Sequence, residues 1–423
     1  LFSKSSNLDK NKNILFIDFT TKKYKHIFKN TGDYNLIKFD RIIPAIWNLE
    51  SYSIIKKSSC LLENYSSLMN KSLKNSINLN ILLVEKNTNL LWEQNSFFES
   101  FFSLNKKSFW DIIKPLLVEQ YEKTSTSAVQ EIELTKQLFK KYNFDTILVW
   151  SENMINHLIA IKLAKKQNIP ICMIQHGLYY DNLECRNFYS FQRLIPKYAD
   201  KFFVWGNVLQ QYVIDLGFPK NNVKIIGSPL HDEIFLNKNN KKLNKNEFIL
   251  LATSYPSQNF TSEFTVELLE KYSNSIKKIC EVTSKLNKKL VIKLHPQSTE
   301  LDISDIVKNI DSRIIVIKSG DITPLIQSCE VFITMDLSTT MLEAQILKKP
   351  IISLQIRDFV VNTEIIKSKS CISVPINDFE INLIRILNDE HFRLDLIKQG
   401  TKFSKNYLSN MGNASKTLLD FLS

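Results

Sequence analysis

Two histidines follow apolar runs of the sequence, in a pattern that suits acid–base work on an anionic substrate. His176 follows the run 169–174 and precedes a glycine, and His295 ends the segment Lys293-Leu294-His295-Pro296. An imidazole has a pKa of about 6.5, so it can take a proton from a hydroxyl or donate a hydrogen bond to a phosphate at neutral pH. We therefore predict roles for His176 as a general base and for His295 and Lys293 at a phosphate. A loop histidine with a structural role is the alternative for each.

A hydroxyl-rich segment, residues 331–354, indicates a strand, a turn, a helix and a second strand. A helix that begins at the carboxyl end of a parallel strand presents backbone N–H groups and a partial positive charge to an anion. Glu343 lies one helical turn beyond the expected tip, where its carboxylate can accept hydrogen bonds from a sugar diol. The segment therefore predicts a nucleotide site, and an ordinary capped helix is the alternative. The side chains expected at the tip are Asp336, Ser338, Thr339 and Thr340.

Other polar residues lie at strand ends with weaker support. Ser254, Tyr255 and Ser257 follow one expected strand, and Gly227 and Ser228 follow another; each group suits donor phosphates, but turn chemistry explains both. Asp18 and Glu152 are spare carboxylates at strand ends, and either could be a base or a helix cap.

The elements that must position these residues form two α/β series. Apolar runs with β-branched residues predict strands, and apolar periodicity predicts helices between them. The expected strands are 13–19, 36–39, 79–84, 146–150, 169–174, 201–204 and 223–226, then 248–252, 290–294, 313–317, 331–334, 351–354 and 371–374. The expected helices include 51–70, 153–167, 207–216, 263–286, 323–328 and 341–347. The aromatic stretch 89–120 suits core packing, with a surface helix that contacts a membrane or a lipid-linked acceptor as the alternative.

The Lys/Asn-rich segment 235–247 separates the two series. We predict a first Rossmann-like domain over residues 1–235, which would bind the acceptor, and a second over 236–400, which would bind the nucleotide donor. A terminal helix over 401–423 is expected to pack back on the first domain.

Composition narrows the class of protein. The chain has 423 residues, and its formal net charge of +12 fits an anionic substrate or an acidic surface. No dinucleotide or P-loop glycine motif, no nucleic-acid signature and no metal-ligand spacing is found in the sequence. Six scattered cysteines, no signal-peptide core and no run long enough for a membrane span are typical of a cytoplasmic protein. Residue 1 is Leu, so residues can be missing upstream.

The motifs together resemble the GT-B superfamily. The pieces that match are Gln175-His176-Gly177, Gly227-Ser228-Pro229, Lys293-Leu294-His295-Pro296 and 336–340 with Glu343. Within that superfamily the chain resembles surface-polysaccharide transferases related to CDP-glycerol glycerophosphotransferases, capsule transferases and polysialyltransferase-like proteins. The resemblance implies an α/β fold of two Rossmann-like domains that face each other across a cleft. It also implies His176 as the base, His295 and the Ser338–Thr339 pair at the donor phosphate, and Glu343 at the ribose.

Some residues depart from these families. Thr339 stands where a second serine is common in the glycerophosphotransferases, and the acidic-acidic-glycine motif of bacterial sialyltransferases is absent. The UDP-N-acetylglucosamine 2-epimerases share the architecture, but their Gly-Gly after the serine is missing here.

We therefore expect a metal-independent glycosyltransferase or polyol-phosphate transferase without a cofactor, whose nucleotide-sugar or CDP-polyol donor is a substrate. Its acceptor would be a hydroxyl of a surface glycan or a lipid-linked acceptor, and it would be cytoplasmic, with peripheral contact to the inner face of the membrane. Nucleic acid is not expected as a partner. A non-hydrolysing sugar-nucleotide epimerase and a non-catalytic binding protein are the alternatives.

Overall fold

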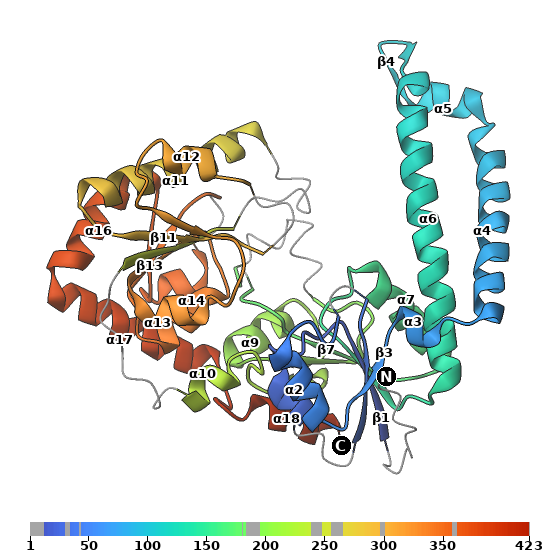
Figure 1. The fold of residues 1–423 in the computed structure, drawn as a ribbon, viewed down its shortest axis with the longest axis horizontal. Coiled ribbons are helices and arrows are strands. Elements are labelled where there is room, and N and C mark those ends of the chain that lie inside the picture. Colours follow the sequence, from blue (N-terminus) through green and yellow to red (C-terminus); the bar gives the residue numbers. More distant parts are fainter. Residues whose placement is uncertain are drawn as a thin grey trace. The chain divides into compact units, whose positions relative to one another are not determined.

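The fold is α/β and contains two large parallel sheets (Figure 1). The computed structural model describes residues 12–29, 34–41, 44–179, 181–182, 195–237, 248–254, 265–296, 301–357 and 362–422. The seven-stranded sheet has the order β3-β2-β1-β6-β7-β8-β9, and the six-stranded sheet has the order β12-β11-β10-β13-β14-β15.

The strands of the seven-stranded sheet are short and mostly buried. They are β1 (Lys12–Ile17), β2 (Tyr34–Phe39), β3 (Leu61–Glu63), β6 (Thr146–Val149), β7 (Ile171–Ile174), β8 (Lys201–Val204) and β9 (Val223–Ile225). The accompanying helices are α1 (Lys25–Lys29), α2 (Leu49–Lys57), α3 (Tyr65–Leu68), α7 (Ile155–Lys166), α9 (Asn207–Asp215) and α10 (Asp232–Asn237). β6 and β7 pair in parallel, and α7 connects them, which confirms the predicted β-α-β unit over 146–174.

The six-stranded sheet consists of β10 (Phe248–Ala252), β11 (Leu290–Lys293), β12 (Ile315–Ile317), β13 (Cys329–Met335), β14 (Ile351–Leu354) and β15 (Ile372–Val374). Its helices are α11 (Val266–Lys285), α12 (Ser304–Lys308), α13 (Thr323–Ser328), α14 (Thr340–Ile346), α15 (Glu364–Lys367), α16 (Phe379–Asn388), α17 (Glu390–Tyr407) and α18 (Ala414–Leu422).

Both faces of the six-stranded sheet are covered. In β10, Ile249 and Leu251 join a core cluster with α11 and α16, whereas Phe248 and Leu250 join a second cluster with α13 and α14. Successive side chains of a strand point to opposite faces, so a strand covered on both sides is apolar throughout. This is why the run 248–252 is entirely buried.

The chain divides into two compact units. One unit consists of residues 1–174 with 197–201 and 422, and the other of 175–196 with 202–421 and 423. Residues 238–247, most of the predicted linker, lie outside the described residues. The predicted domain limits at residues 235 and 400 therefore stay predictions.

Two predicted elements are wrong. The expected strand 79–84 lies inside the helix α4 (Lys71–Trp92), because Leu73, Ile77 and Thr88 are buried at helical spacing and Asn70 caps the first turn. A short apolar run does not distinguish a strand from a helix. The expected helix 51–70 is interrupted by β3, which pairs in parallel with β2.

The aromatic stretch 89–120 packs only in part. It comprises the end of α4, α5 (Asn95–Phe101), the small β4–β5 hairpin (Ser103–Leu104 and Lys107–Ser108) and the start of α6 (Trp110–Lys141). Trp110 and Phe98 are buried, as expected, but Phe97 and Phe101 are exposed. The core-packing prediction therefore fails for the outer rings.

Candidate functional site

Asp336 holds the loop after β14 and does not cap α14. Its backbone is left-handed, with φ of 52°. Its Oδ1 accepts the N–H groups of Ile356 and Arg357 at 2.8 and 3.0 Å, and its Oδ2 accepts the Arg357 guanidinium at 2.8 Å. Burial raises the pKa of Asp336, and Arg357 opposes that shift. The expectation that Asp336 offers an oxygen to the helix start is thus corrected.

Three half-buried hydroxyls form the tip of α14. Ser338 Oγ and Thr340 Oγ1 lie 2.8 Å apart and share a hydrogen bond. Thr339 occupies the cap position with a helical φ of −57° and makes no side-chain cap bond. Instead, its Oγ1 accepts the backbone N–H of Leu178 at 3.0 Å. A phosphate contact by these hydroxyls stays a prediction, but the geometry brings Thr339 to the segment that carries His176.

The turn 175–179 is fixed from within. The buried amide of Gln175 donates to Gly177 O at 2.8 Å, and its Oε1 accepts the N–H of Trp205 at 2.8 Å. A Cβ at Gly177 would lie 3.1 Å from Thr339 Oγ1, so a small residue permits the close approach. His176 is half-buried, and its Nδ1 lies 3.3 Å from the hydroxyl of Tyr179. The predicted base therefore sits in a turn with several defined supports.

Tyr407, near the end of α17, is part of this support and was not anticipated from the sequence. Its hydroxyl accepts hydrogen bonds from Gln175 Nε2 at 3.2 Å and from Tyr179 N at 3.5 Å. Burial raises the pKa of Tyr407, which keeps the hydroxyl neutral. No local signal could have revealed this residue, since its partners are far away in the sequence.

The carboxyl ends of β11, β10 and β13 are neighbours, because these strands are adjacent and parallel. They place His295, Ser254 and the α14 tip along one edge of the six-stranded sheet. His295 is half-buried, and its backbone N–H donates to Thr253 Oγ1 at 3.2 Å. Ser254 is half-buried at the end of β10, whereas Tyr255 and Ser257 lie outside the described residues.

Lys293 is buried, and its ammonium donates to the carbonyl oxygens of Leu294 at 2.8 Å and Lys318 at 3.2 Å. These contacts hold the strand ends together. Glu343 accepts the Thr323 hydroxyl at 3.1 Å, which ties α14 to α13. Contact of either side chain with a donor stays a prediction.

Gly227 and Ser228 have structural contacts, with Ser409 and His231 respectively. Gly227 has φ of 85°, and a Cβ there would overlap the carbonyl of Ser409. Ser228 is buried, and its Oγ lies 2.6 Å from Nδ1 of His231. The glycine is thus explained by the approach of the C-terminal segment, and the donor role of this pair also stays a prediction.

The two spare carboxylates have structural partners. Glu152 accepts the backbone N–H groups of Lys197, Tyr198 and Ala199, at 2.6 Å for the shortest of these bonds. Asp18 accepts the N–H of Arg41 at 2.6 Å and the amide of Asn156. Both acids therefore brace loops of the first unit.

Asp181 was missed by the sequence analysis. It follows the His176 turn, and its Oδ1 accepts the N–H of Glu364 at 3.0 Å. Burial raises the pKa of Asp181 to about 6. A carboxyl with a raised pKa that follows the His176 turn in the sequence is a candidate acid–base group.

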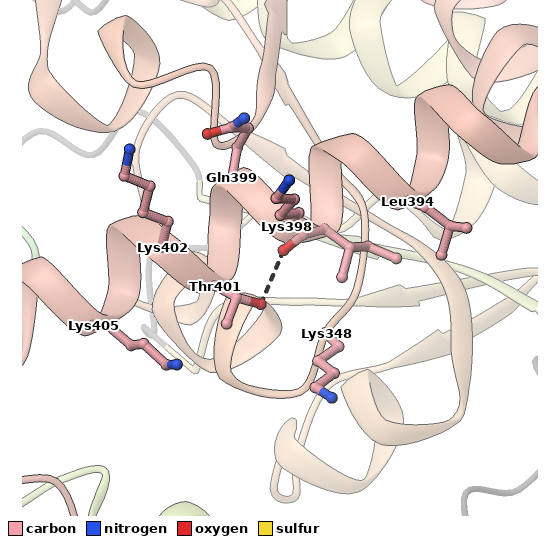
Figure 2. A pocket seen from close by; sticks show the side chains of 8 residues that line it. Lys348, Leu394, Lys398, Gln399, Thr401, Lys402 and Lys405 are labelled. Carbon is pink, nitrogen blue, oxygen red and sulfur yellow. Dashed lines mark hydrogen bonds between the residues drawn. The ribbon is translucent and has the colours of Figure 1, made fainter.

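A cavity of about 760 Å³ lies beside α17, outside this set of residues (Figure 2). Its lining is Lys348, Leu394, Ile397, Lys398, Gln399, Thr401, Lys402 and Lys405. Figure 2 shows the side chains of Lys348, Lys402 and Lys405 around the hollow. Lysine is its only titratable residue type, and none of the predicted site residues lines it.

Within the described ranges, no group of three or more histidine, cysteine or acidic side chains could hold a metal ion. Metal independence stays a prediction. In the same ranges, no helix is long and apolar enough to cross a membrane.

Residues 2–364 match the family described as the LIC12162 family transferase. The chain belongs to this transferase family. No curated protein matches the chain at a significant level.

Several solved structures share the fold of this LIC12162 family transferase. S. aureus MnaA in complex with UDP superposes with a TM-score of 0.62 at 14% identity, covering 97% of this chain and 96% of the other. The UDP-GlcNAc 2-epimerase of Neisseria meningitidis, bound to UDP-GlcNAc, gives 0.59 at 13% identity over 97% and 99%. A glycosyltransferase of Rickettsia africae ESF-5 gives 0.51 at 14% identity over 97% of each chain. The predicted GT-B fold class is confirmed, and the narrower likeness to CDP-glycerol or polysialic acid enzymes stays a prediction.

Proposed function

We propose that this LIC12162 family transferase is a metal-independent glycosyltransferase that moves a sugar from a nucleotide-activated donor to a hydroxyl of a surface glycan or lipid-linked acceptor. A polyol phosphate is the other group that it would carry. The observation that carries the proposal is the bond between Leu178 and Thr339, which joins the His176 turn to the hydroxyl tip of α14. The base that would take the acceptor's proton and the hydroxyls that would hydrogen-bond to the phosphate thus lie on two connected segments.

In the proposed reaction, the acceptor oxygen forms a bond to the anomeric carbon of the donor sugar while the bond from that carbon to the phosphate oxygen breaks. The imidazole of His176 takes the acceptor's proton. The nucleoside diphosphate leaves, and its developing charge is stabilised by His295 and by the N–H groups and hydroxyls around Ser338. The Tyr179 hydroxyl, 3.3 Å from Nδ1, orients the His176 ring.

The identity of the nucleotide-activated donor is the first property to determine. We propose a UDP-sugar as the first donor to test, because related folds are solved with UDP or UDP-GlcNAc bound. A thermal-shift screen of UDP-, CDP-, CMP- and GDP-linked donors should show one class that stabilises the protein, by about 2.7 kcal/mol at one hundred times its dissociation constant. If no class shifts the transition, a nucleotide donor is excluded.

The role of His295 is then tested in an activity assay with the donor that binds. His295→Ala should lower turnover by about a hundredfold or more while the melting temperature stays close to that of the wild type. His391→Ala on the exposed face of α17 is the matched control and should keep full activity. Full activity of His295→Ala with the true donor would show that this residue is not part of the site.

A non-hydrolysing sugar-nucleotide epimerase is the second candidate, because UDP-GlcNAc 2-epimerases share the fold over nearly the whole chain. Incubation with UDP-GlcNAc and no acceptor separates the two. An epimerase yields a second sugar nucleotide, whereas a transferase needs an acceptor before it releases UDP. Nucleotide binding without turnover in either assay would instead indicate a binding protein.

A further inference from the structure

The hairpin of α4 and α6 carries a surface that the proposed reaction does not use. In Figure 1 the two helices run side by side away from the sheet of the first unit, with α5 and the β4–β5 hairpin at their far end. More than half of the exposed large apolar side chains in the described part of the chain belong to this one hairpin. Large exposed apolar patches on a folded protein usually mark an interaction surface.

The far end, residues 95–117, is here called the hairpin tip, and its outer rings are held in place. Trp110 is fully buried, stacks on Phe98 with ring centroids 4.4 Å apart and donates its indole N–H to Asn95 at 3.3 Å. Around this small core, Phe97, Phe101 and Leu104 are 61%, 70% and 70% exposed. The exposed side chains thus belong to a packed element and not to a frayed loop.

The apolar surface points in more than one direction. On α4, Leu79, Leu83 and Leu90 are exposed, and helical periodicity puts them opposite the buried Ile77 and Thr88. On α6, the exposed Ile112 and Leu116 lie one turn apart, on the side away from the buried Trp110. A single protein face covers one side of a hairpin, whereas lipid surrounds it. Exposed apolar side chains thus lie on the outward faces of both helices, and lipid can contact both faces at once.

Lysines accompany these rings. The β4–β5 turn has Asn105 and Lys106 at φ of 50° and 63°, the geometry of a tight two-residue hairpin, and it presents Lys106 and Lys107 at the tip. Lys114 lies 5.8 Å from the Trp110 ring centroid and bonds Asn95 at 3.0 Å. No acidic side chain among the described residues forms an ion pair with these three lysines, which suits them to phosphate headgroups.

We propose that the hairpin tip docks on an anionic lipid bilayer, with Phe97, Phe101 and Leu104 at the level of the upper acyl chains and Lys106 and Lys107 at the headgroup phosphates. Leu116 at the start of α6 and Leu90 at the end of α4, both exposed, extend the apolar contact. This proposal does not depend on the reaction or on the donor. It predicts binding to lipid by the full chain in the absence of any nucleotide.

Vesicle flotation of the full-length protein tests the proposal. Vesicles of phosphatidylcholine and phosphatidylglycerol should carry the protein, and vesicles of phosphatidylcholine alone should carry much less. Phe97→Ser/Phe101→Ser/Leu104→Ser should weaken binding by at least about a hundredfold. Lys106→Glu/Lys107→Glu should weaken it by at least about tenfold and mostly on the anionic vesicles. The matched control is Leu49→Ser/Val266→Ser/Ile381→Ser, at residues exposed by 87%, 70% and 69%, which should bind as the wild type does.

A second measurement locates the contact and guards against misfolded variants. The indole introduced by Phe101→Trp should be quenched by brominated lipids on anionic vesicles, and the one introduced by Ile381→Trp should not. Sedimentation velocity without lipid distinguishes the other occupant, a second copy of the chain. If the wild type does not float, or if the serine variant instead converts a dimer to a monomer and leaves flotation unchanged, the proposal is overturned.

Discussion

The hydroxyl of Thr339 accepts the backbone N–H of Leu178 at 3.0 Å, and this bond joins the tip of α14 to the turn that carries His176. Thr339 belongs to the segment predicted to bind the donor phosphate, and Leu178 belongs to the segment predicted to act on the acceptor. A change at Thr339 should therefore affect both segments.

The first prediction is that Thr339→Ala lowers turnover by about tenfold or more and stability by about 1 kcal/mol, because the Leu178 N–H loses its acceptor. Thr339→Ser keeps the acceptor oxygen and should retain most of the turnover and most of the stability. Steady-state kinetics and thermal unfolding of the two variants measure these two quantities. Equal activity of Thr339→Ala and the wild type would mean that the bond does not position the turn.

The second prediction concerns the space between Gly177 and Thr339. Gly177→Ala places a methyl group 3.1 Å from Thr339 Oγ1, so it should destabilise the turn. In the background of Thr339→Ala that hydroxyl is gone, and the same change should cost less. A double-mutant cycle should therefore give a coupling energy of about 0.5–3 kcal/mol. Additive effects would show that the two residues are not in contact in solution.

How far the sequence predicts the fold depends on the kind of element. The ranges expected for β8, β10 and α13 agree residue for residue with the structure, because short apolar runs bounded by polar residues specify buried parallel strands and the helices between them. The run 79–84 fails because its leucines form an exposed face in the middle of α4, a helix that the Asn70 cap and the packing of Leu73, Ile77 and Thr88 determine.

The candidate site is predictable in a similar, partial sense. In a parallel sheet, polar residues that follow the carboxyl ends of the strands gather at one edge. This rule places His295 and Ser338 at the same edge of the six-stranded sheet. The bonds of Thr339 to Leu178 and of Tyr407 to Gln175 join segments distant in sequence. They depend on tertiary packing, which no local pattern encodes.

The third prediction is a pH dependence from Asp181, whose pKa is raised by burial to about 6 from an unfolded value of about 3.9. Between these values the unfolded state releases the proton first, so this group lowers the free energy of unfolding as pH rises from about 4 to 6. Asp181→Asn should match the wild type near pH 4 and be more stable at pH 7. Urea unfolding at both pH values measures this, with the exposed Asp305→Asn as control. A variant that is less stable at pH 7 would contradict it.

The fourth prediction concerns the buried ion pair of Lys38 and Asp40, whose side chains are 1% and 5% exposed. Burial outweighs Lys38 and raises the pKa of Asp40 to about 6. Lys38→Met leaves an unpaired buried carboxylate and should cost about 3–5 kcal/mol at neutral pH. The loss should shrink at pH 5, where Asp40 takes up a proton.

The control for that pair is Lys38→Met/Asp40→Leu, which removes both charges and should recover most of the stability. Urea unfolding of the wild type, the single variant and the double variant at pH 7 and pH 5 provides the comparison. A double variant as unstable as Lys38→Met would show that packing, and not the unpaired charge, causes the loss.

The fifth prediction concerns the anchor of the last helix. Asp232 is buried, and its two oxygens accept the N–H groups of Ala414 at 3.0 Å and Ser415 at 2.8 Å, at the start of α18. A carboxylate at a helix start satisfies otherwise unpaired N–H groups and interacts with the helix dipole. Asp232→Asn keeps the shape but loses one acceptor and the charge, so it should destabilise the protein by about 1–3 kcal/mol. Hydrogen exchange of the amides of 414–418 should rise in this variant. It should stay unchanged in the control Glu233→Gln, at a half-buried neighbour whose carboxylate accepts the amide of Asn237. Unchanged exchange in both variants would show that Asp232 does not anchor α18.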